Sequence, residues 1–247
     1  MKHLRPAILL IAIQCVWLTN AFSRNDTIQL SRAFGLQLSG FVRGDYLYDT
    51  RQGGEAVEGL FLFYPAKPLL DENGQDINAT PKSNLSTISS RLSMRVFAPE
   101  VFRAKSSAYI EVDFTGTSNT NGIRLRHAYI NLAWNKSSLL IGRTWHPFSA
   151  SCMPNVLALN TGAPFWGFNR SDQIRFNYTP RHWALSAIVN FQSDYASLGP
   201  DGKSGNYMRN ATIPEFSIDI AHKTNTLQTG VVGAVKTLKP RLFTQIS

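Results

Sequence analysis

One stretch of this sequence decides its fold class: Ala104-Lys105-Ser106-Ser107-Ala108-Tyr109-Ile110-Glu111-Val112-Asp113-Phe114-Thr115. Its even-numbered positions are apolar or small, and its odd-numbered positions are mostly polar or charged. Because successive side chains point to opposite faces of a β-strand, this pattern predicts a long strand with one apolar and one polar face. A helix would instead repeat its apolar residues every three or four positions.

The same alternation recurs along the chain and predicts nine long strands. They span about residues 36–49, 86–97, 104–115, 123–134, 138–146, 173–179, 183–193, 214–222 and 227–238. The connections alternate between short ones (98–103, 135–137, 180–182, 223–226) and mostly long ones (50–85, 146–172, 194–213). Short turns at one end and long loops at the other are typical of bacterial outer-membrane barrels. The sequence therefore predicts an all-β protein, an antiparallel up-and-down transmembrane β-barrel.

The composition favours a membrane setting over a soluble one. Charged residues make up 17% of the 247 residues, below the roughly 25% of soluble globular proteins. No amphipathic helix is evident that could cover the apolar face of a soluble sheet. In a barrel, that face contacts lipid, the polar face lines a wet lumen and the backbone groups pair around the ring. The two cysteines exclude a disulfide-rich scaffold.

The N-terminus is typical of an exported protein. Lys2, His3 and Arg5 precede an apolar stretch at residues 7–18, and small residues flank Phe22 at the expected cleavage position. We therefore expect a cleaved signal peptide at residues 1–23, a periplasmic segment at 24–35 and a barrel domain at 36–247. The expected location is the outer membrane, and outer-membrane lipid is the expected surrounding.

The strand expected at residues 123–134 breaks the alternation. Arg124 and Arg126 share their parity with the apolar Ala128, Ile130 and Leu132, so an unbroken register would turn both arginines toward lipid. Two interpretations are open. Either the arginines lie above the bilayer in the outer rim, or a β-bulge near His127 shifts the register.

A resemblance to a known family rests on residues 140–175. The stretch Leu140-Ile141-Gly142-Arg143-Thr144-Trp145-His146-Pro147-Phe148 resembles the Gly-(Gln/Arg)-x-Trp-x-Pro-Phe motif of the Gram-negative outer-membrane porins, in particular the DcaP-like porins. The stretches Asn160-Thr161-Gly162-Ala163-Pro164-Phe165 and 168–175 resemble their third loop and following strand. The likeness covers about residues 36–240 and corresponds to the N-terminal half of such a porin.

The resemblance implies several features of the whole protein. In that family the loop after the fifth strand folds into the lumen and narrows it, and the protein is usually a homotrimer. The residues that would form this constriction here are Arg143, Trp145, Pro147, Phe148, Asn160, Gly162, Pro164, Phe165 and Arg170. Such porins have about sixteen to eighteen strands. Nine predicted strands favour a partial chain, and a smaller closed barrel is the alternative.

The charged residues on the polar face of the predicted strands are the candidate pore-lining residues. They are Arg43, Asp45, Arg91, Arg95, Glu111, Asp113 and Arg175. Fixed arginines opposite carboxylates create a field that selects solutes by charge. Because basic residues exceed acidic ones, the expected function is passive diffusion of small hydrophilic solutes with a mild preference for anions. The alternative is that these charges only pair with one another inside the barrel.

Other function classes have weaker support in the sequence. The five histidines lack metal-site spacing, and no phosphate loop, Gly-x-Ser-x-Gly or His-Glu-x-x-His motif is present. We therefore expect no metal, no cofactor and no enzymatic activity. The net charge of +9 is dispersed over alternating strand positions rather than clustered, which argues against nucleic-acid binding. A secreted all-β adhesin or carbohydrate-binding domain is the main alternative, and a barrel hydrolase is a second one.

Overall fold

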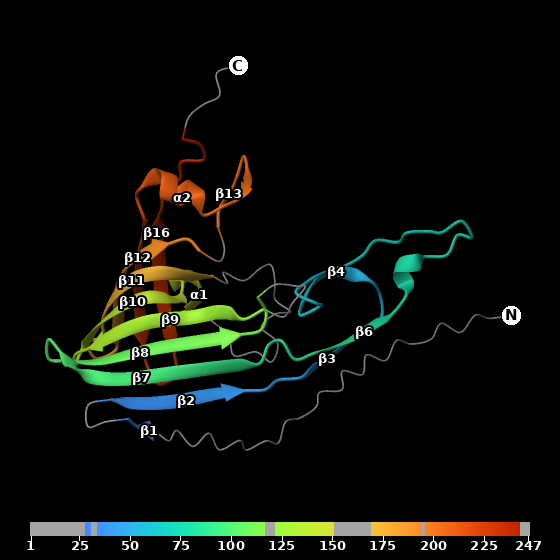
Figure 1. Cartoon of the computed structure of the whole chain (residues 1–247). Coiled ribbons are helices and arrows are strands. Elements are labelled where there is room, and N and C mark those ends of the chain that lie inside the picture. Colours follow the sequence, from blue (N-terminus) through green and yellow to red (C-terminus); the bar gives the residue numbers. More distant parts are fainter. Residues whose placement is uncertain (1–27, 31–33, 117–121, 151–168, 194–195, 243–247) are drawn as a thin grey trace.

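The computed structural model describes residues 28–30, 34–116, 122–150, 169–193 and 196–242. Its main feature is an antiparallel sheet of ten strands (Figure 1). In sheet order these are β1 (Ile28–Gln29), β2 (Gly35–Phe41), β7 (Arg91–Val101), β8 (Ala104–Asp113), β9 (Arg124–Ala133), β10 (Ser137–Trp145), β11 (Arg170–Tyr178), β12 (Trp183–Phe191), β15 (Glu215–Lys223) and β16 (Gln228–Val235). The expected signal peptide, residues 1–23, lies outside the described residues and stays a prediction.

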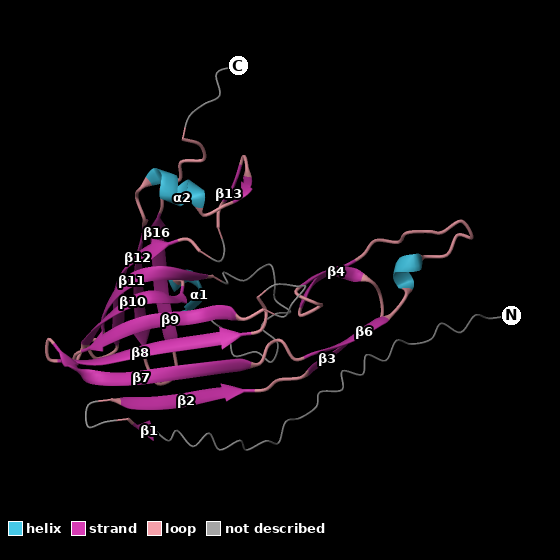
Figure 2. Cartoon of the chain, viewed as in Figure 1, coloured by secondary structure: helices cyan, strands magenta, loops and turns pink. Residues whose placement is uncertain are grey.

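The strand topology confirms the predicted up-and-down antiparallel fold. Apart from the two-residue β1, the sheet has nine strands, and each pairs with the next one along the sheet. Figure 2 shows how strands dominate the part of the chain that the structure describes, where the helices are the short η1 (Ile77–Ala79), α1 (Pro147–Ala150) and α2 (Asn206–Ala211). None of the helices among the described residues is long and apolar enough to cross a membrane. Within the described residues β1 and β16 form the two edges and do not pair, so the sheet is an open part of a barrel.

The first predicted strand, 36–49, is wrong in its extent. The chain leaves the ten-stranded sheet after β2, and β3 (Asp45–Asp49) pairs with β6 (Lys82–Ser86) in a separate ladder. The break coincides with a turn at the start of β7, where the Ser90 N–H donates to the carbonyl of Thr87. The β2–β7 ladder therefore ends at the pair Phe41–Arg91.

The segment from β3 to β6 extends well beyond the end of the main sheet (Figure 1). It carries a second hairpin of β4 (Gly53–Ala56) and β5 (Phe61–Pro65). Asp76 holds its outer part together, because its carboxylate accepts the N–H of Leu69 at 2.9 Å and pairs with Arg51 at 2.7 Å. These two interactions, the Leu69 hydrogen bond first, keep the pKa of Asp76 below its usual value. A further connection, between β12 and β15, holds β13 (Leu198–Gly199), β14 (Gly202–Lys203) and α2.

The two faces of the main sheet differ as the alternation predicts. One face exposes large apolar side chains on nearly every strand, and the other buries polar ones. The exposed apolar residues that share a face by register are Leu38, Leu92, Ile110, Ile130, Ile141, Ile174, Phe176, Phe216, Ile218, Ile220 and Val231. A soluble protein rarely exposes a continuous apolar surface of this extent. Such a surface is typical of a sheet that faces lipid.

A β-bulge between β8 and β9 settles the two interpretations of Arg124 and Arg126. The ladder shifts register between Glu111 and Val112, which pair with His127 and Leu125. The residue skipped on β9 is Arg126, and Arg124 then stands opposite Asp113. Of the two open interpretations, the bulge near His127 is therefore the correct one. It turns both arginines toward the polar face, because an extra residue in one strand reverses the parity beyond it.

Candidate functional site on the polar face of the sheet

The polar face carries a cluster of charged residues where β7, β8 and β9 lie side by side. Arg126 donates to Glu111 at 2.7 Å and to Asp113 at 2.6 Å. Arg124 approaches Asp113 at 3.4 Å, and Arg91 lies 3.7 Å from Glu111. Asp113 and Arg126 are only 2% and 4% exposed, whereas Arg91 is 37% exposed. The carboxylates are thus covered, and a guanidinium is the charge that this cluster presents to solvent.

The other pore-lining candidates on this face are also arginines. The guanidinium of Arg95 lies 5.1 Å from the ring centre of Tyr109, a cation–π contact. Arg175, on β11, donates to the side chain of Gln173 and to the carbonyl of Trp145. Arg43 and Asp45 form an ion pair at 2.7 Å, but they lie beyond β2 and outside the ten-stranded sheet. They lie outside the sheet because the β2–β7 ladder already ends at the pair Phe41–Arg91.

Trp145 lies among charged groups at the end of β10. The guanidinium carbons of Arg126 and Arg170 lie 6.0 and 4.9 Å from its ring centre. The ring of His127 meets it edge-on at 5.5 Å, and Nδ1 of His127 lies 3.1 Å from the Thr144 hydroxyl. The resemblance places Trp145 among the expected constriction residues. The β9–β10 ladder ends at Arg143 and Ala128, so Trp145 is paired only on its β11 side, with Arg170, and its ring contacts Arg126 and His127 of the polar face.

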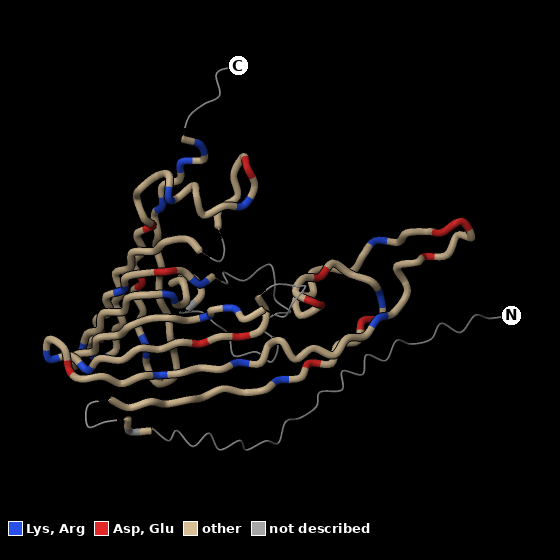
Figure 3. Tube along the Cα trace, viewed as in Figure 1, with Lys and Arg blue, Asp and Glu red and all other residues tan. Residues whose placement is uncertain are grey.

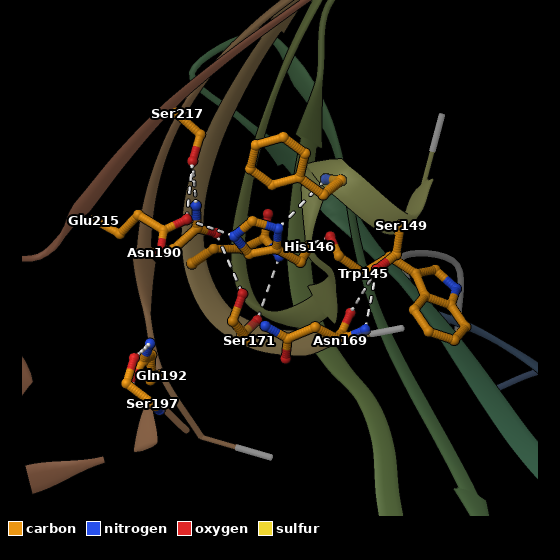
Figure 4. A network of polar contacts seen from close by, with 12 residues as sticks. Trp145, His146, Ser149, Asn169, Ser171, Asn190, Gln192, Ser197, Glu215 and Ser217 are labelled. Carbon is orange, nitrogen blue, oxygen red and sulfur yellow. Dashed lines mark hydrogen bonds and ion pairs between the residues drawn. The ribbon is translucent and has the colours of Figure 1, made fainter. Parts of the chain in front are cut away.

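A buried network ties the segment after β10 to the far side of the polar face (Figure 4). His146 Nε2 lies 2.6 Å from Glu215 Oε1, although β11 and β12 lie between their strands. Three inter-strand steps in a flat sheet would separate them by about 14 Å. The sheet therefore curves toward this face, and the chain after β10 folds over it, with α1 in contact with β15.

Hydrogen bonds around Glu215 extend the network across the strands between. Asn190 donates to the Ser217 hydroxyl at 2.8 Å and accepts from Ser171 at 3.2 Å, and the Ser217 hydroxyl donates to Glu215 (Figure 4). The N–H of Phe148 donates to Nδ1 of His146, so Nε2 is the nitrogen that donates to Glu215. Both ring nitrogens are engaged in this network, which leaves neither available to activate a serine hydroxyl in this arrangement.

The expected constriction residues fall into three groups. Trp145, Pro147 and Arg170 are grouped near the start of the segment that crosses the polar face, and Phe148 is half exposed beside them. Arg143 pairs with Asp172, Nε to Oδ1 at 3.2 Å, and by register shares a face with the apolar Ile141. The remaining four, Asn160, Gly162, Pro164 and Phe165, lie outside the described residues.

Sequence reasoning did not assign the residues that hold this site together. Arg126 was visible only as a break in the alternation. His146, Asn190 and Glu215 gave no local signal, because their contacts join strands that are far apart in the sequence. Among the described residues, no cluster of three or more His, Cys, Asp or Glu side chains could hold a metal ion.

Comparisons with known proteins show a matching family and a solved structure with the same fold. The family described as DcaP outer membrane protein matches residues 40–185, more than half of the chain. The crystal structure of the outer-membrane channel DcaP of Acinetobacter baumannii shares the fold, with a TM-score of 0.56 and 24% identity over 78% of this chain. This chain covers 50% of that channel, so it spans about half of its length.

A second solved structure is more distant. An anion-selective porin from Comamonas acidovorans has a TM-score of 0.47 and 15% identity, over 83% of this chain and 58% of its own. No curated protein matches the sequence. The fold, the motif around Trp145 and the family match agree, and on this evidence the chain belongs to the DcaP outer membrane protein family.

Proposed function

We propose that this chain forms part of the wall of an outer-membrane channel through which small hydrophilic solutes diffuse passively, with a preference for anions. The observation that carries the proposal is the layering of charge on the polar face. The acidic groups Glu111 and Asp113 are covered by arginines, and the partly exposed Arg91 and Arg95 remain as the charges that β7 presents on this face. A solute moving along the part of this face formed by β7, β8 and β9 meets positive groups first.

The apolar face supports the membrane part of the proposal. A secreted adhesin or carbohydrate-binding domain would need a second layer over the exposed apolar residues, and the described residues form no such layer. We also propose that residues 1–23 are a signal peptide that is cleaved on export, and that the whole channel assembles as a homotrimer.

Charge reversal on β7 tests the anion preference. We expect Arg91→Glu with Arg95→Glu to lower the chloride-to-potassium permeability ratio by roughly a factor of two or more, because the charges that β7 presents on the polar face change sign. The ratio is obtained from the reversal potential of the full chain in planar bilayers under a KCl gradient. Lys67→Glu with Lys239→Glu, at exposed positions between β5 and β6 and after β16, is the matched control and should leave the ratio unchanged. An unaltered reversal potential in the β7 variant would remove Arg91 and Arg95 from the selectivity mechanism.

We also propose that the segment after β10 narrows the passage, held in place by the His146–Glu215 contact. Glu215→Ala removes the partner on β15, so we expect a higher single-channel conductance and more frequent current fluctuations as the segment loses its attachment. Glu58→Ala, an exposed acid in the β4–β5 connection, serves as the control. Equal conductance in the Glu215 variant and the parent would show that this contact does not set the width.

A further inference from the structure

Four short turns at one end of the sheet, all of them within the described residues, form a continuous rim, which we call the short-turn rim (residues 102–105, 134–136, 179–182 and 222–227). Each turn is hydrogen-bonded to the next. Trp134 Nε1 donates to the carbonyl of Phe102 at 3.0 Å, the Thr179 N–H donates to Lys136 at 2.8 Å, and the Lys223 N–H donates to His182 at 2.8 Å. The rim is therefore one connected surface rather than four independent loops.

Every turn of the rim carries an exposed basic residue. These are Arg103, Lys136, Arg181 and Lys223, and Lys105 adds a fifth at the start of β8. The rim segments contain no Asp or Glu, and Glu100 on β7 is the acid that precedes them. Figure 3 shows basic residues at the tip of the β7–β8 hairpin, at this end of the sheet. Consecutive turns are two strands apart, about 10 Å, so the bases are spread along the rim rather than stacked on one point.

Several residues of the turns have a positive φ, a backbone conformation that glycine or asparagine adopts more easily than other residues. Phe102, Arg103 and Arg181 have φ values of 52°, 59° and 50°. Residues with side chains are uncommon in this left-handed region, and two-residue hairpin turns favour Asn-Gly. A phenylalanine that is 84% exposed stands beside an arginine at the tip of the first turn. Side chains kept at such strained positions, and an exposed phenylalanine beside an arginine, indicate that the chemistry of these side chains is needed at the turns.

Aromatic residues complete the rim on its apolar side. Tyr178 and Trp183 are exposed on the lipid-facing side of the sheet, next to the turn that contains Arg181. Aromatic side chains of this kind mark the level where hydrocarbon gives way to headgroups. The basic residues lie just beyond them, at the depth of lipid phosphates. Lys and Arg side chains near an anionic membrane surface bind it through long-range attraction and direct phosphate contacts.

We infer that the short-turn rim binds the phosphate groups of anionic phospholipids in the leaflet that the short turns reach. In outer-membrane barrels the short turns lie on the periplasmic side, where the leaflet consists of phospholipids. Phe102 inserts at the hydrocarbon boundary, while Arg103 and its counterparts in the next three turns contact headgroups. This site is independent of the proposed transport, because it lies on the outer edge of the sheet and not on its polar face.

The test measures lipid preference directly. The full chain is reconstituted in dioleoylphosphatidylcholine bilayers, and tryptophan quenching by dibrominated phosphatidylglycerol is compared with quenching by dibrominated phosphatidylcholine. Trp134 and Trp183 report on the rim. We expect the relative binding constant to favour phosphatidylglycerol by about threefold or more, and to approach one at high salt, where exposed charges are screened. A constant of one at low salt would overturn the proposal.

Variants assign the preference to the rim. Arg103→Gln, Lys136→Gln, Arg181→Gln and Lys223→Gln together should bring the relative binding constant close to one. Lys67→Gln, Lys203→Gln, Arg209→Gln and Lys239→Gln remove the same number of exposed charges elsewhere and should retain the preference. Arg103→Lys with Arg181→Lys keeps the charge and should also retain it. A preference that survives in the rim variant, or one found for lipopolysaccharide but not for phosphatidylglycerol, would contradict the assignment.

Discussion

Replacing Arg126 with methionine is expected to destabilise the folded sheet by about 3–5 kcal/mol. Arg126 donates to Glu111 and Asp113, and it is 4% exposed. Its removal leaves two covered carboxylates, two positions apart on β8, each with one remaining arginine at 3.7 Å (Glu111) or 3.4 Å (Asp113). Burial of a charge without its partner is costly, whereas a well-packed methionine replaces only the aliphatic part of the side chain. Urea unfolding of the full chain in lipid vesicles, followed by tryptophan fluorescence, measures the difference.

Two further variants separate the loss of the ion pairs from the loss of packing. Arg95→Met removes an arginine from the same face that contacts Tyr109 rather than a carboxylate, so it should cost about 1 kcal/mol or less. Glu111→Gln with Asp113→Asn in the Arg126→Met background should recover much of the lost stability, because the uncompensated charges are gone. Equal destabilisation by Arg126→Met and Arg95→Met would show that the ion pairs of Arg126 with Glu111 and Asp113 do not contribute to the stability of the sheet.

Replacing Gly142 with valine is expected to prevent correct pairing of β9 and β10. Gly142 has a φ of 131°, a conformation that residues with side chains rarely adopt. A Cβ at this position would lie against the carbonyl of Ala128 and 2.7 Å from the Cα of Tyr129. Both obstacles are backbone atoms, which cannot rotate away. Backbone strain and overpacking together should cost about 2–6 kcal/mol, comparable with the whole stability of many domains.

The yield of folded protein measures this effect. Folded and unfolded forms of a membrane barrel are separated by their migration on gels before and after heating, and we expect Gly142→Val to remain largely in the unfolded form. Gly233→Ala is the control, because Gly233 also lies in a strand of the sheet but has open space around the position of a Cβ. Normal folding of Gly142→Val would mean that β9 and β10 can move apart to make room for the side chain without a loss of stability.

Most of the fold could be predicted from the sequence. The alternation in residues 104–115 correctly assigned Ile110 to the exposed face, and Glu111 and Asp113 to the polar face. The break at Arg124 and Arg126 indicated a bulge as one of two interpretations, and that interpretation is the correct one. The separate β3–β6 ladder was not predicted, because Tyr46 and Tyr48 continue the alternation of β2 although their pairing partner changes.

The contacts that assemble the candidate site could not be predicted in the same way. Trp145 was expected at the constriction from the resemblance, but its contacts with the guanidinium groups of Arg126 and Arg170 had no local signal in the sequence. The partner of His146, Glu215, lies 69 positions further along the chain. It is on β15, which is separated from β10 in the sheet by β11 and β12. Nothing in the spacing of His146 and Glu215 links them, because their meeting depends on how far the sheet curves.

The sequence by itself determined the strands, their two faces and their order, since each depends on alternation and connection length, which are local properties of the chain. Only the tertiary structure decided which charges are covered and which remain exposed. Curvature brings side chains of non-adjacent strands into hydrogen-bonding distance, and the bulge at Arg126 rotates one arginine onto two acids. The charge that the polar face presents therefore depends on the fold and cannot be obtained by counting residues.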